Sequence, residues 1–231
     1  MFKLDFKSQI VEFNEIWNKR YQDPIITENW IENDWVKGRT DYLTFLIRVN
    51  NKEVVEKIIE IQRELANYSC IDLAPEIYLH LTVKETGCFL VNEKKDFDEI
   101  ERCDLENLVN QADDILQNFK PFKIKLWKLN NFKSAVVLEE LDGGVIRGIN
   151  EALMNVTGVR KLYNDPFFLP HVSVALYKSL NQYIELIKFL EENRETHLPS
   201  LWVESIELVI AHLPKFNRFP SLESVQEFKL H

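Results

Sequence analysis

The sequence is poor in cysteine and glycine, and each shortage excludes a class of site. Its 231 residues include three cysteines, Cys70, Cys88 and Cys103, and none of them stands in C-x-x-C spacing. This excludes a disulfide framework and a cysteine zinc site. The glycines form no glycine-rich phosphate loop, and the pair Gly143-Gly144 is typical of a turn before a helix.

The chain also lacks excess positive charge and long apolar runs. Its formal net charge is −9, so it has no broad basic face for long nucleic acid, although a small cleft for one phosphate or one RNA end is compatible with it. No apolar run approaches the length of a membrane span, and the N-terminal residues mix charged and apolar side chains, unlike a signal peptide. We expect a cytoplasmic monomer that does not bind membranes.

Apolar and aromatic residues, in contrast, are plentiful. The chain is 45% hydrophobic and has 15 Phe and 5 Trp, which is enough to build a sizeable core in one large domain or two lobes that share a core. Residues 1–40 are expected to form an N-terminal helix over 5–22 and a loop-rich wrap that Trp30 and Trp35 attach to the body. Residues 41–231 are expected to form the two-lobed domain.

Periodicity predicts the elements of that domain. Helices are expected at 51–67, 94–118, 145–155 and 180–193. Strands are expected at 41–50, 77–84, 122–129, 134–141, 171–177, 202–210 and 224–230. Each half of the chain has a helix followed by a strand that bears His-x-Thr or His-x-Ser, and no linker separates the halves. The order of elements predicts an α+β fold with two closely packed lobes.

The two matching strands carry the chemistry. The stretches HLTV and HVSV begin at His80 and His171 and share one pattern: histidine, apolar, hydroxyl, apolar. Since alternate side chains of a strand point to one face, His80 lies beside Thr82 and His171 beside Ser173. Residues i and i+2 are roughly 6.5–7 Å apart, so an imidazole and a hydroxyl can reach the same tetrahedral anion.

Two imidazoles and two hydroxyls are sufficient for phosphodiester hydrolysis. The reaction takes a proton from the attacking water and gives one to the leaving oxygen, and histidines with pKa values near about 6.5 can do both. Hydroxyls donate hydrogen bonds to the phosphate oxygens, so the arrangement requires neither a metal nor another cofactor. The alternative is that each histidine is a hydrogen-bonded structural residue at a strand end. The repetition of the whole pattern in successive halves favours an active site.

These motifs resemble those of the two-histidine (2H) phosphoesterase superfamily, which includes 2′,5′ RNA ligase-like proteins and RNA 2′,3′-cyclic phosphodiesterases. HLTVKETG at 80–87 is similar to its first motif and LPHVSV at 169–174 to its second. The likeness runs from about residue 41 to residue 230. Ser173 stands where threonine is commoner and keeps the hydroxyl.

The resemblance implies a bilobal 2H fold, with two antiparallel β-sheets flanked by helices around a central cleft. It also implies that His171 is the base that activates water, that His80 is the acid that protonates the leaving oxygen, and that Thr82 and Ser173 hold the phosphate. The expected substrate is a 2′,3′-cyclic phosphodiester of a nucleotide or an RNA end, and a reverse 2′,5′ ligase activity is compatible with it. Two alternatives stay open: a 2′,5′-oligonucleotide phosphodiesterase, and a non-catalytic module that binds nucleotides or RNA ends.

Five further residues are candidates for the cleft. By alternation, Lys84 shares a face with His80, and Tyr177 shares one with His171; Arg48 faces the cleft from the strand at 41–50. Each has a structural alternative: a solvated lysine, an ordinary lining residue and a salt-bridged arginine. Phe167 and Phe168 either form a stacking platform or anchor a loop.

Overall fold

The structure is a computed structural model that describes residues 5–26, 35–214 and 218–231. Among these residues no helix is both long and apolar enough to cross a membrane. The expected mixture of helices with a largely antiparallel sheet is confirmed. Trp30 lies outside the described residues. Trp35 packs its ring against the rings of Tyr42 and Phe89, as expected for an attachment to the body, while 44% of it remains exposed.

The expected N-terminal helix forms as α1, Phe6–Trp17. The side chain of Asp5 caps it by accepting a hydrogen bond from the Ser8 backbone N–H at 2.9 Å, which satisfies one of the free donors of the first turn. Phe13 is fully buried in a small cluster with Leu141 and Leu169. Leu169 lies two residues before the second histidine motif, so α1 packs against a segment that enters that motif.

The chain contains two similar strand–helix–strand units. The first unit consists of β1 (Asp41–Arg48), α2 (Lys52–Leu65) and β3 (His80–Val91); the second consists of β6 (Ala135–Leu141), α4 (Val145–Leu153) and β7 (His171–Tyr177). In each unit the first strand pairs antiparallel with the strand that bears the histidine motif. The duplication expected from the sequence is therefore present in the topology.

Local chemistry explains where α2 and α4 begin. The Asn51 side chain accepts from the Val54 backbone N–H at 3.2 Å and caps α2. Asp142 accepts from the Gly144 N–H at 2.6 Å and the Ile146 N–H at 2.5 Å and so holds the first turn of α4. Gly144 has φ +91°, a left-handed conformation that glycine adopts without steric cost.

The remaining elements complete the sheet and its cover. They are β2 (Ile71–Leu73), β4 (Glu99–Glu101), α3 (Leu105–Leu116), β5 (Phe122–Asn131), α5 (Tyr183–Glu192), β8 (Leu201–Val203), β9 (Ser205–His212) and β10 (Ser221–Lys229). Several elements differ from the sequence expectation: β2 was not expected, β3 continues to Val91, and the strand expected at 202–210 is divided into β8 and β9. Residues 99–101, expected in a helix, pair with β3 instead. The strand expected from residue 77 begins at His80, because residues 76–78 form a 3₁₀ turn after Pro75.

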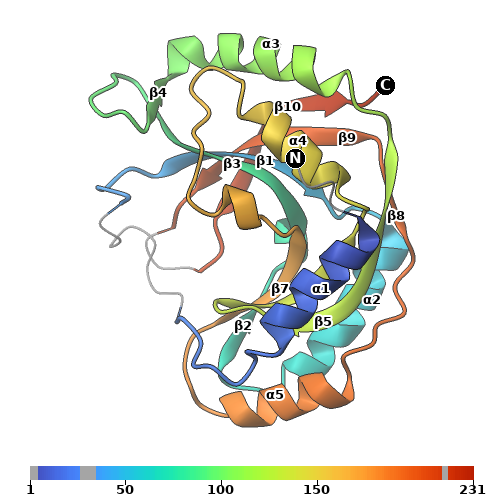
Figure 1. Cartoon of the computed structure of the whole chain (residues 1–231). Helices are drawn as coiled ribbons and strands as arrows, with labels where there is room; N and C mark the ends of the chain where they lie inside the picture. The colour runs from blue at the N-terminus through green and yellow to red at the C-terminus, as the bar shows by residue number, and fades with distance from the viewer. Residues whose placement is uncertain (1–4, 27–34, 215–217) are drawn as a thin grey trace.

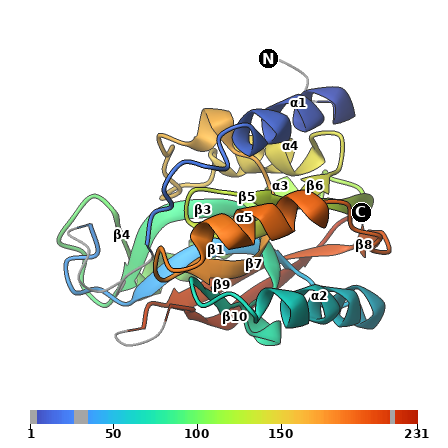
Figure 2. The same ribbon diagram turned by 90° about the horizontal axis from the view of Figure 1, so that it is seen from below.

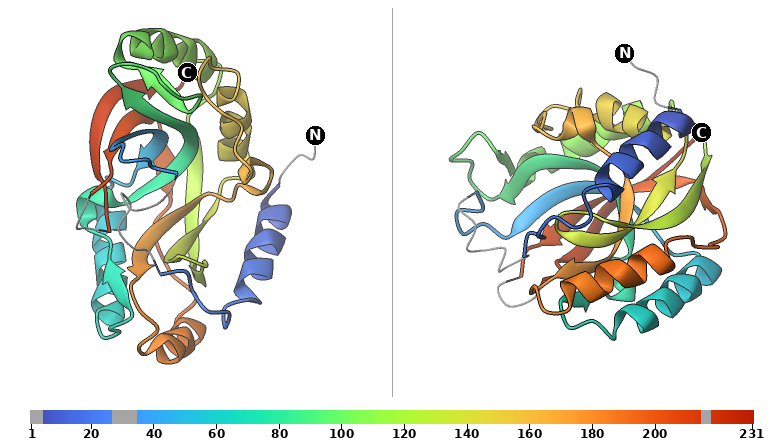
Figure 3. Two further views of the ribbon diagram at one scale, coloured as in Figure 1. Left: turned by 90° about the vertical axis from the view of Figure 1, so that its left-hand side faces the viewer. Right: turned by 60° about the horizontal axis from the view of Figure 1, so that its bottom comes forward.

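The strands follow the order β10-β9-β1-β3-β7-β6-β5-β8. The two strand groups expected as separate sheets thus form one continuous sheet. Among the described residues, β3 and β7 pair only at Leu81 and Val172, so one residue pair joins the two groups. Figure 1 shows α3 and α4 at one end of the molecule and α2 and α5 at the other, with the sheet curving between them. Figures 2 and 3 show α1 on the side of the sheet opposite α2.

Candidate active site

The two histidine motifs meet at the junction of β3 and β7. Leu81 lies opposite Val172, so the antiparallel register places Thr82 beside His171, and His80 beside Ser173. The two histidines are then diagonal neighbours, about 7–8 Å apart, and the two hydroxyls form the other diagonal. Leu81 and Val172 are fully buried. The four polar side chains are half-buried and line one cavity of about 410 Å³.

Both imidazoles are held in the same way. His80 Nδ1 lies 2.5 Å from the carbonyl oxygen of Tyr78, and His171 Nδ1 lies 2.9 Å from the carbonyl oxygen of Leu169. A carbonyl only accepts, so Nδ1 carries the hydrogen in each ring, and Nε2 is left to accept or donate a proton. In each motif the acceptor is the residue two positions before the histidine, so the local chain fixes the tautomer.

Aromatic walls surround both rings. Tyr78 stands edge-on to His80 with ring centroids 4.8 Å apart, and the centroids of Phe132 and His171 are 4.4 Å apart. This apolar burial disfavours the imidazolium. Burial, together with the neighbouring His171, lowers the pKa of His80 to about 4, against the hydrogen bond to Tyr78, which raises it. Burial also lowers the pKa of His171.

The cavity contains no lysine or arginine among the described residues that line it. Its lining residues are Ile16, Tyr78, His80, Thr82, Glu85, Phe132, Ser134, Ala135, Asn150, Leu162, Asn164, Asp165, Phe167, Phe168, Leu169, His171, Ser173 and Leu176. A bound phosphate would therefore meet hydroxyl and imidazole donors rather than a fixed cation. Half of the lining residues are apolar or aromatic, and such walls are common in small-molecule sites.

Residues 47–213 of the sequence match the family described as the 2'-5' RNA ligase superfamily. This match covers more than two thirds of the chain and includes both histidine motifs. The chain belongs to the 2'-5' RNA ligase superfamily. The resemblance expected from HLTV and HVSV is thereby confirmed. No curated protein matches the sequence.

Solved structures share the fold of this superfamily member. TT0787 of Thermus thermophilus is 18% identical with a TM-score of 0.56, and the match covers 81% of this chain and 97% of that protein. E. coli LigT is 15% identical with a TM-score of 0.58, both in apo form and complexed with 3'-AMP; the match covers 83% of this chain and 98% of LigT. At these identities the comparison establishes the fold alone.

A β-bulge follows each motif of this 2'-5' RNA ligase superfamily member. The two bulges place Lys84 and Tyr177 outside the cleft that alternation along the strands predicts for them. Lys84 and Tyr177 follow the hydroxyl residues by two and four positions, so strict alternation would place both on the cleft face. Each strand has one extra residue directly after the hydroxyl, and the side chains that follow it next are turned to the opposite face. Glu85 and Leu176 line the cavity instead.

The displaced residues have structural partners. Lys84 is fully buried and its Nζ lies 2.6 Å from both carboxylate oxygens of Asp165. Tyr177 is also fully buried, and its hydroxyl donates to the side-chain oxygen of Asn131. The expectation of a cleft position is wrong for both, because the bulge shifts the period.

Arg48 does not line the cleft either. Its guanidinium pairs with Glu207 at 3.1 Å and donates to the carbonyls of Ile77 and Leu222. This is the salt-bridged strand arginine that was its structural alternative. Phe167 and Phe168 do line the cavity, and Phe167 is 74% exposed, so its ring is available for stacking.

Sequence reasoning missed several lining residues. Glu85 requires knowledge of the bulge. Asn150 lies in a helix that appears only amphipathic in sequence, and Phe132 and Ser134 belong to the turn between β5 and β6. None of these residues has a signal in its own sequence neighbourhood, since the fold brings them to the cavity.

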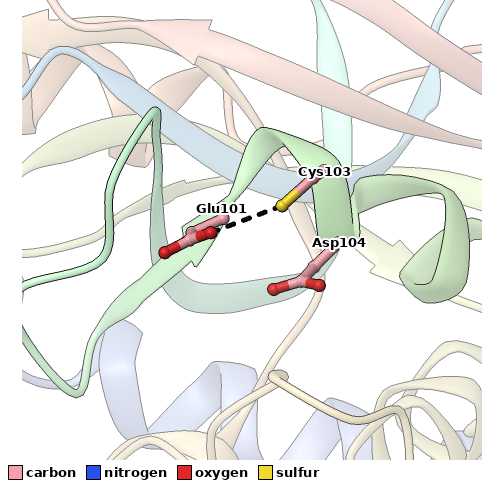
Figure 4. A group of neighbouring side chains, drawn as sticks. All are labelled: Glu101, Cys103 and Asp104. Atoms are coloured by element: carbon pink, nitrogen blue, oxygen red, sulfur yellow. Dashed lines mark hydrogen bonds between the residues drawn. The ribbon is translucent and has the colours of Figure 1, made fainter.

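A second polar group lies outside the cavity. Glu101, Cys103 and Asp104 place ligand-type atoms within 4.8 Å of one another (Figure 4). Two of the three groups are already hydrogen-bonded: Glu101 accepts from the Lys94 backbone N–H at 2.9 Å and from the Cys103 thiol at 3.3 Å. The hydrogen bond to Glu101 raises the pKa of the thiol, which disfavours the thiolate that binds metals.

Proposed function

We propose that the chain is a metal-independent phosphodiesterase that hydrolyses 2′,3′-cyclic or related phosphodiesters of nucleotides or RNA ends. One observation carries this proposal: two imidazoles with the same tautomer alternate with two hydroxyls around the β3–β7 junction. A single phosphate between the two diagonals can contact all four groups. Membership of the 2'-5' RNA ligase superfamily supports the same chemistry.

In this proposal each histidine performs one proton transfer. Water attacks phosphorus while Nε2 of His171 takes its proton, and the bond from phosphorus to the leaving ribose oxygen breaks as Nε2 of His80 protonates that oxygen. His171 ends protonated and His80 neutral, and solvent exchange restores both. Thr82 and Ser173 donate hydrogen bonds to the non-bridging oxygens, whose charge grows in the transition state.

The lowered pKa values have a consequence for binding. With both imidazoles mainly neutral in the empty cleft, the active arrangement needs one of them to gain a proton. A bound phosphodiester anion stabilises the imidazolium, since no described lysine or arginine lines the cavity to neutralise it. Substrate binding should therefore raise the pKa of a histidine and promote the proton uptake that catalysis requires.

We further propose that the chain acts as a cytoplasmic monomer, with residues 1–40 attached to the two-lobed domain at 41–231. Its three cysteines are unpaired, which suits a reducing compartment. The attachment is supported by contacts of α1 with the loop before α4. Gln9 donates to Asp142 and accepts from the Gly143 N–H, both at 2.9 Å.

The test is a substrate panel assayed with the full chain. It comprises 2′,3′-cyclic nucleotides, RNA with a cyclic-phosphate end, and 2′,5′-linked oligonucleotides. We expect turnover of the cyclic phosphates, with loss of activity in His80→Ala and not in His197→Ala, which alters an exposed histidine outside the cleft. Preferential cleavage of the 2′,5′ oligomers would favour that alternative, and binding without turnover on every substrate would favour a binding module.

A further inference from the structure

The bulges after the two motifs occupy equivalent positions. On β3, Thr82 lies opposite Leu46 and Lys84 opposite Phe45, which leaves Val83 as the extra residue. On β7 the register with β6 shifts in the same way, between Ser173 and Ala175, and leaves Val174. A bulge interrupts the ladder, so the extra residue has no regular strand partner on that side and the strand bends there.

A buried side-chain amide binds the carbonyl of each extra residue. Asn150 Nδ2 donates to the Val83 carbonyl at 2.7 Å. Gln62 Nε2 donates to the Val174 carbonyl at 2.9 Å and also to the Ala74 carbonyl at 2.8 Å. Asn150 is 1% exposed and Gln62 is 7% exposed. Buried amide N–H groups require acceptors, and each of these two amides finds one in a bulge carbonyl.

The two amides cross between the strand–helix–strand units. Asn150 lies in α4, which precedes β7 in the chain, yet it binds β3. Gln62 lies in α2, which precedes β3, yet it binds β7. Each helix therefore holds the motif strand of the other unit. Because β3 and β7 share a single residue pair, these two contacts add cross-links beside the junction.

The position of the bulge decides where the preceding hydroxyl points. Thr82 and Ser173 lie one residue before the extra residue, so a shift of either bulge toward the histidine would place the extra residue between the histidine and the hydroxyl and turn the hydroxyl from their shared face. Catalytic groups tolerate little displacement: about 1 Å costs about 100-fold in rate. The Val174 carbonyl also accepts from the Ala74 backbone N–H at 2.9 Å. Among the described side chains, only that of Asn150 donates to the Val83 carbonyl.

We propose that Asn150 and Gln62 are positioning residues that fix the two bulges and thereby aim Thr82 and Ser173 at the phosphate. This proposal rests on the proposed function of the same cleft. It gives α2 and α4 a role in catalysis through residues that lie outside both histidine motifs.

The first test removes each donor with little change of shape. Asn150→Leu and Gln62→Met should lower kcat about 10- to 100-fold, with a smaller change in KM and with the folded far-ultraviolet spectrum retained. The matched control is Gln9→Met. Gln9 is also a buried amide that bonds to Asp142 and to the Gly143 backbone, but it lies on α1, away from both bulges. It should leave kcat unchanged. Folded Asn150→Leu and Gln62→Met with the kcat of the wild type would overturn the proposal.

A second variant separates positioning from general loss of structure. In Asn150→Asp the ionised carboxylate cannot donate to the Val83 carbonyl, whereas the protonated carboxyl can. The ratio of its kcat to that of the wild type should therefore rise as the pH falls. A kcat ratio that stays constant with pH in folded Asn150→Asp would contradict the proposal. This measurement tests the proposal even if Asn150→Leu fails to fold.

Binding of inorganic phosphate distinguishes this inference from the proposed function. Calorimetry should show weaker phosphate binding in Asn150→Leu than in the wild type and in Gln9→Met. If the wild type hydrolyses no phosphodiester, the proposed function fails, while weakened phosphate binding would still support the aiming of the hydroxyls. Unchanged phosphate binding together with unchanged kcat would refute the inference alone.

Discussion

At the residue scale, the cleft combines neutral donors with histidines whose charge is disfavoured. Burial lowers the pKa of His80 to about 4 and lowers that of His171 from its ordinary value. The ordinary value is about 6.5. For kcat/KM, one imidazole of the free enzyme must be protonated and the other neutral, and this form is most abundant between the two pKa values.

The lowered pKa values of the two histidines determine on which side of the ordinary pKa the pH optimum should lie. Both pKa values lie below about 6.5, so the bell-shaped profile of kcat/KM should have its maximum on the acid side of that value. The profile of kcat reports the complex, in which the phosphate anion stabilises the imidazolium, so its maximum should lie at a higher pH. Steady-state kinetics on a cyclic phosphate, whose own charge does not change over this range, measures both. A kcat/KM maximum above neutral pH would contradict the assignment.

Truncation of the four motif residues tests their roles individually. His80→Ala and His171→Ala should each lower kcat by about 10²–10⁴-fold, the usual contribution of a general acid or base. The double variant should resemble the worse single variant, since the two histidines share one coupled proton transfer. Thr82→Ala and Ser173→Ala should cost less, about 10- to 100-fold, because each removes one neutral donor. Near-native turnover in either histidine variant would exclude the two-histidine mechanism.

At the element scale, the bulges separate what the sequence could predict from what it could not. Alternation correctly paired His80 with Thr82 and His171 with Ser173 on one face, because these residues precede the extra residue. It misplaced Lys84 and Tyr177, which follow it. A bulge depends on the register with a neighbouring strand that is distant in sequence, and neither Val83 nor Val174 has a side chain that marks one. Alternation along a strand therefore predicted the correct face for side chains only up to the bulge.

The buried ion pair of Lys84 with Asp165 leads to a prediction about stability. Its ammonium and the carboxylate of Asp165 are almost fully buried, with exposed side-chain fractions of 0% and 4%. Lys84→Met would leave the buried carboxylate without its cation, a change that typically costs about 3–5 kcal/mol. Adding Asp165→Asn removes that charge and should recover most of the loss. Urea unfolding of the two single variants and the double variant measures the coupling, and independent effects of the two substitutions would refute a structural pair.

At the scale of the whole molecule, the duplication was visible in the sequence but the way its halves combine was not. Helix and strand periods reveal two units of strand, helix and motif strand. Nothing in either period shows that α2 binds β7 through Gln62 or that α4 binds β3 through Asn150. The union of two expected sheets into one depends on a single pair, Leu81 and Val172, and no pattern in the sequence specifies so short a contact.

The distribution of ligand-type groups over the molecule supports a final prediction, on metals. In the part of the chain that the structure describes, the one cluster of three such groups is Glu101, Cys103 and Asp104, and none of these residues lines the cleft. Within the cleft, the Asp165 carboxylate pairs with Lys84, and the Nδ1 of both His80 and His171 is hydrogen-bonded to a carbonyl.

Metal-assisted hydrolysis commonly uses three protein ligands around the ion, whereas two imidazoles and two hydroxyls can supply the proton transfers and hydrogen bonds themselves. Turnover should therefore be unchanged after dialysis against EDTA, measured on the same cyclic phosphate before and after the treatment. Loss of activity on chelation, with recovery on adding one divalent metal and not others, would require a different mechanism for this cleft.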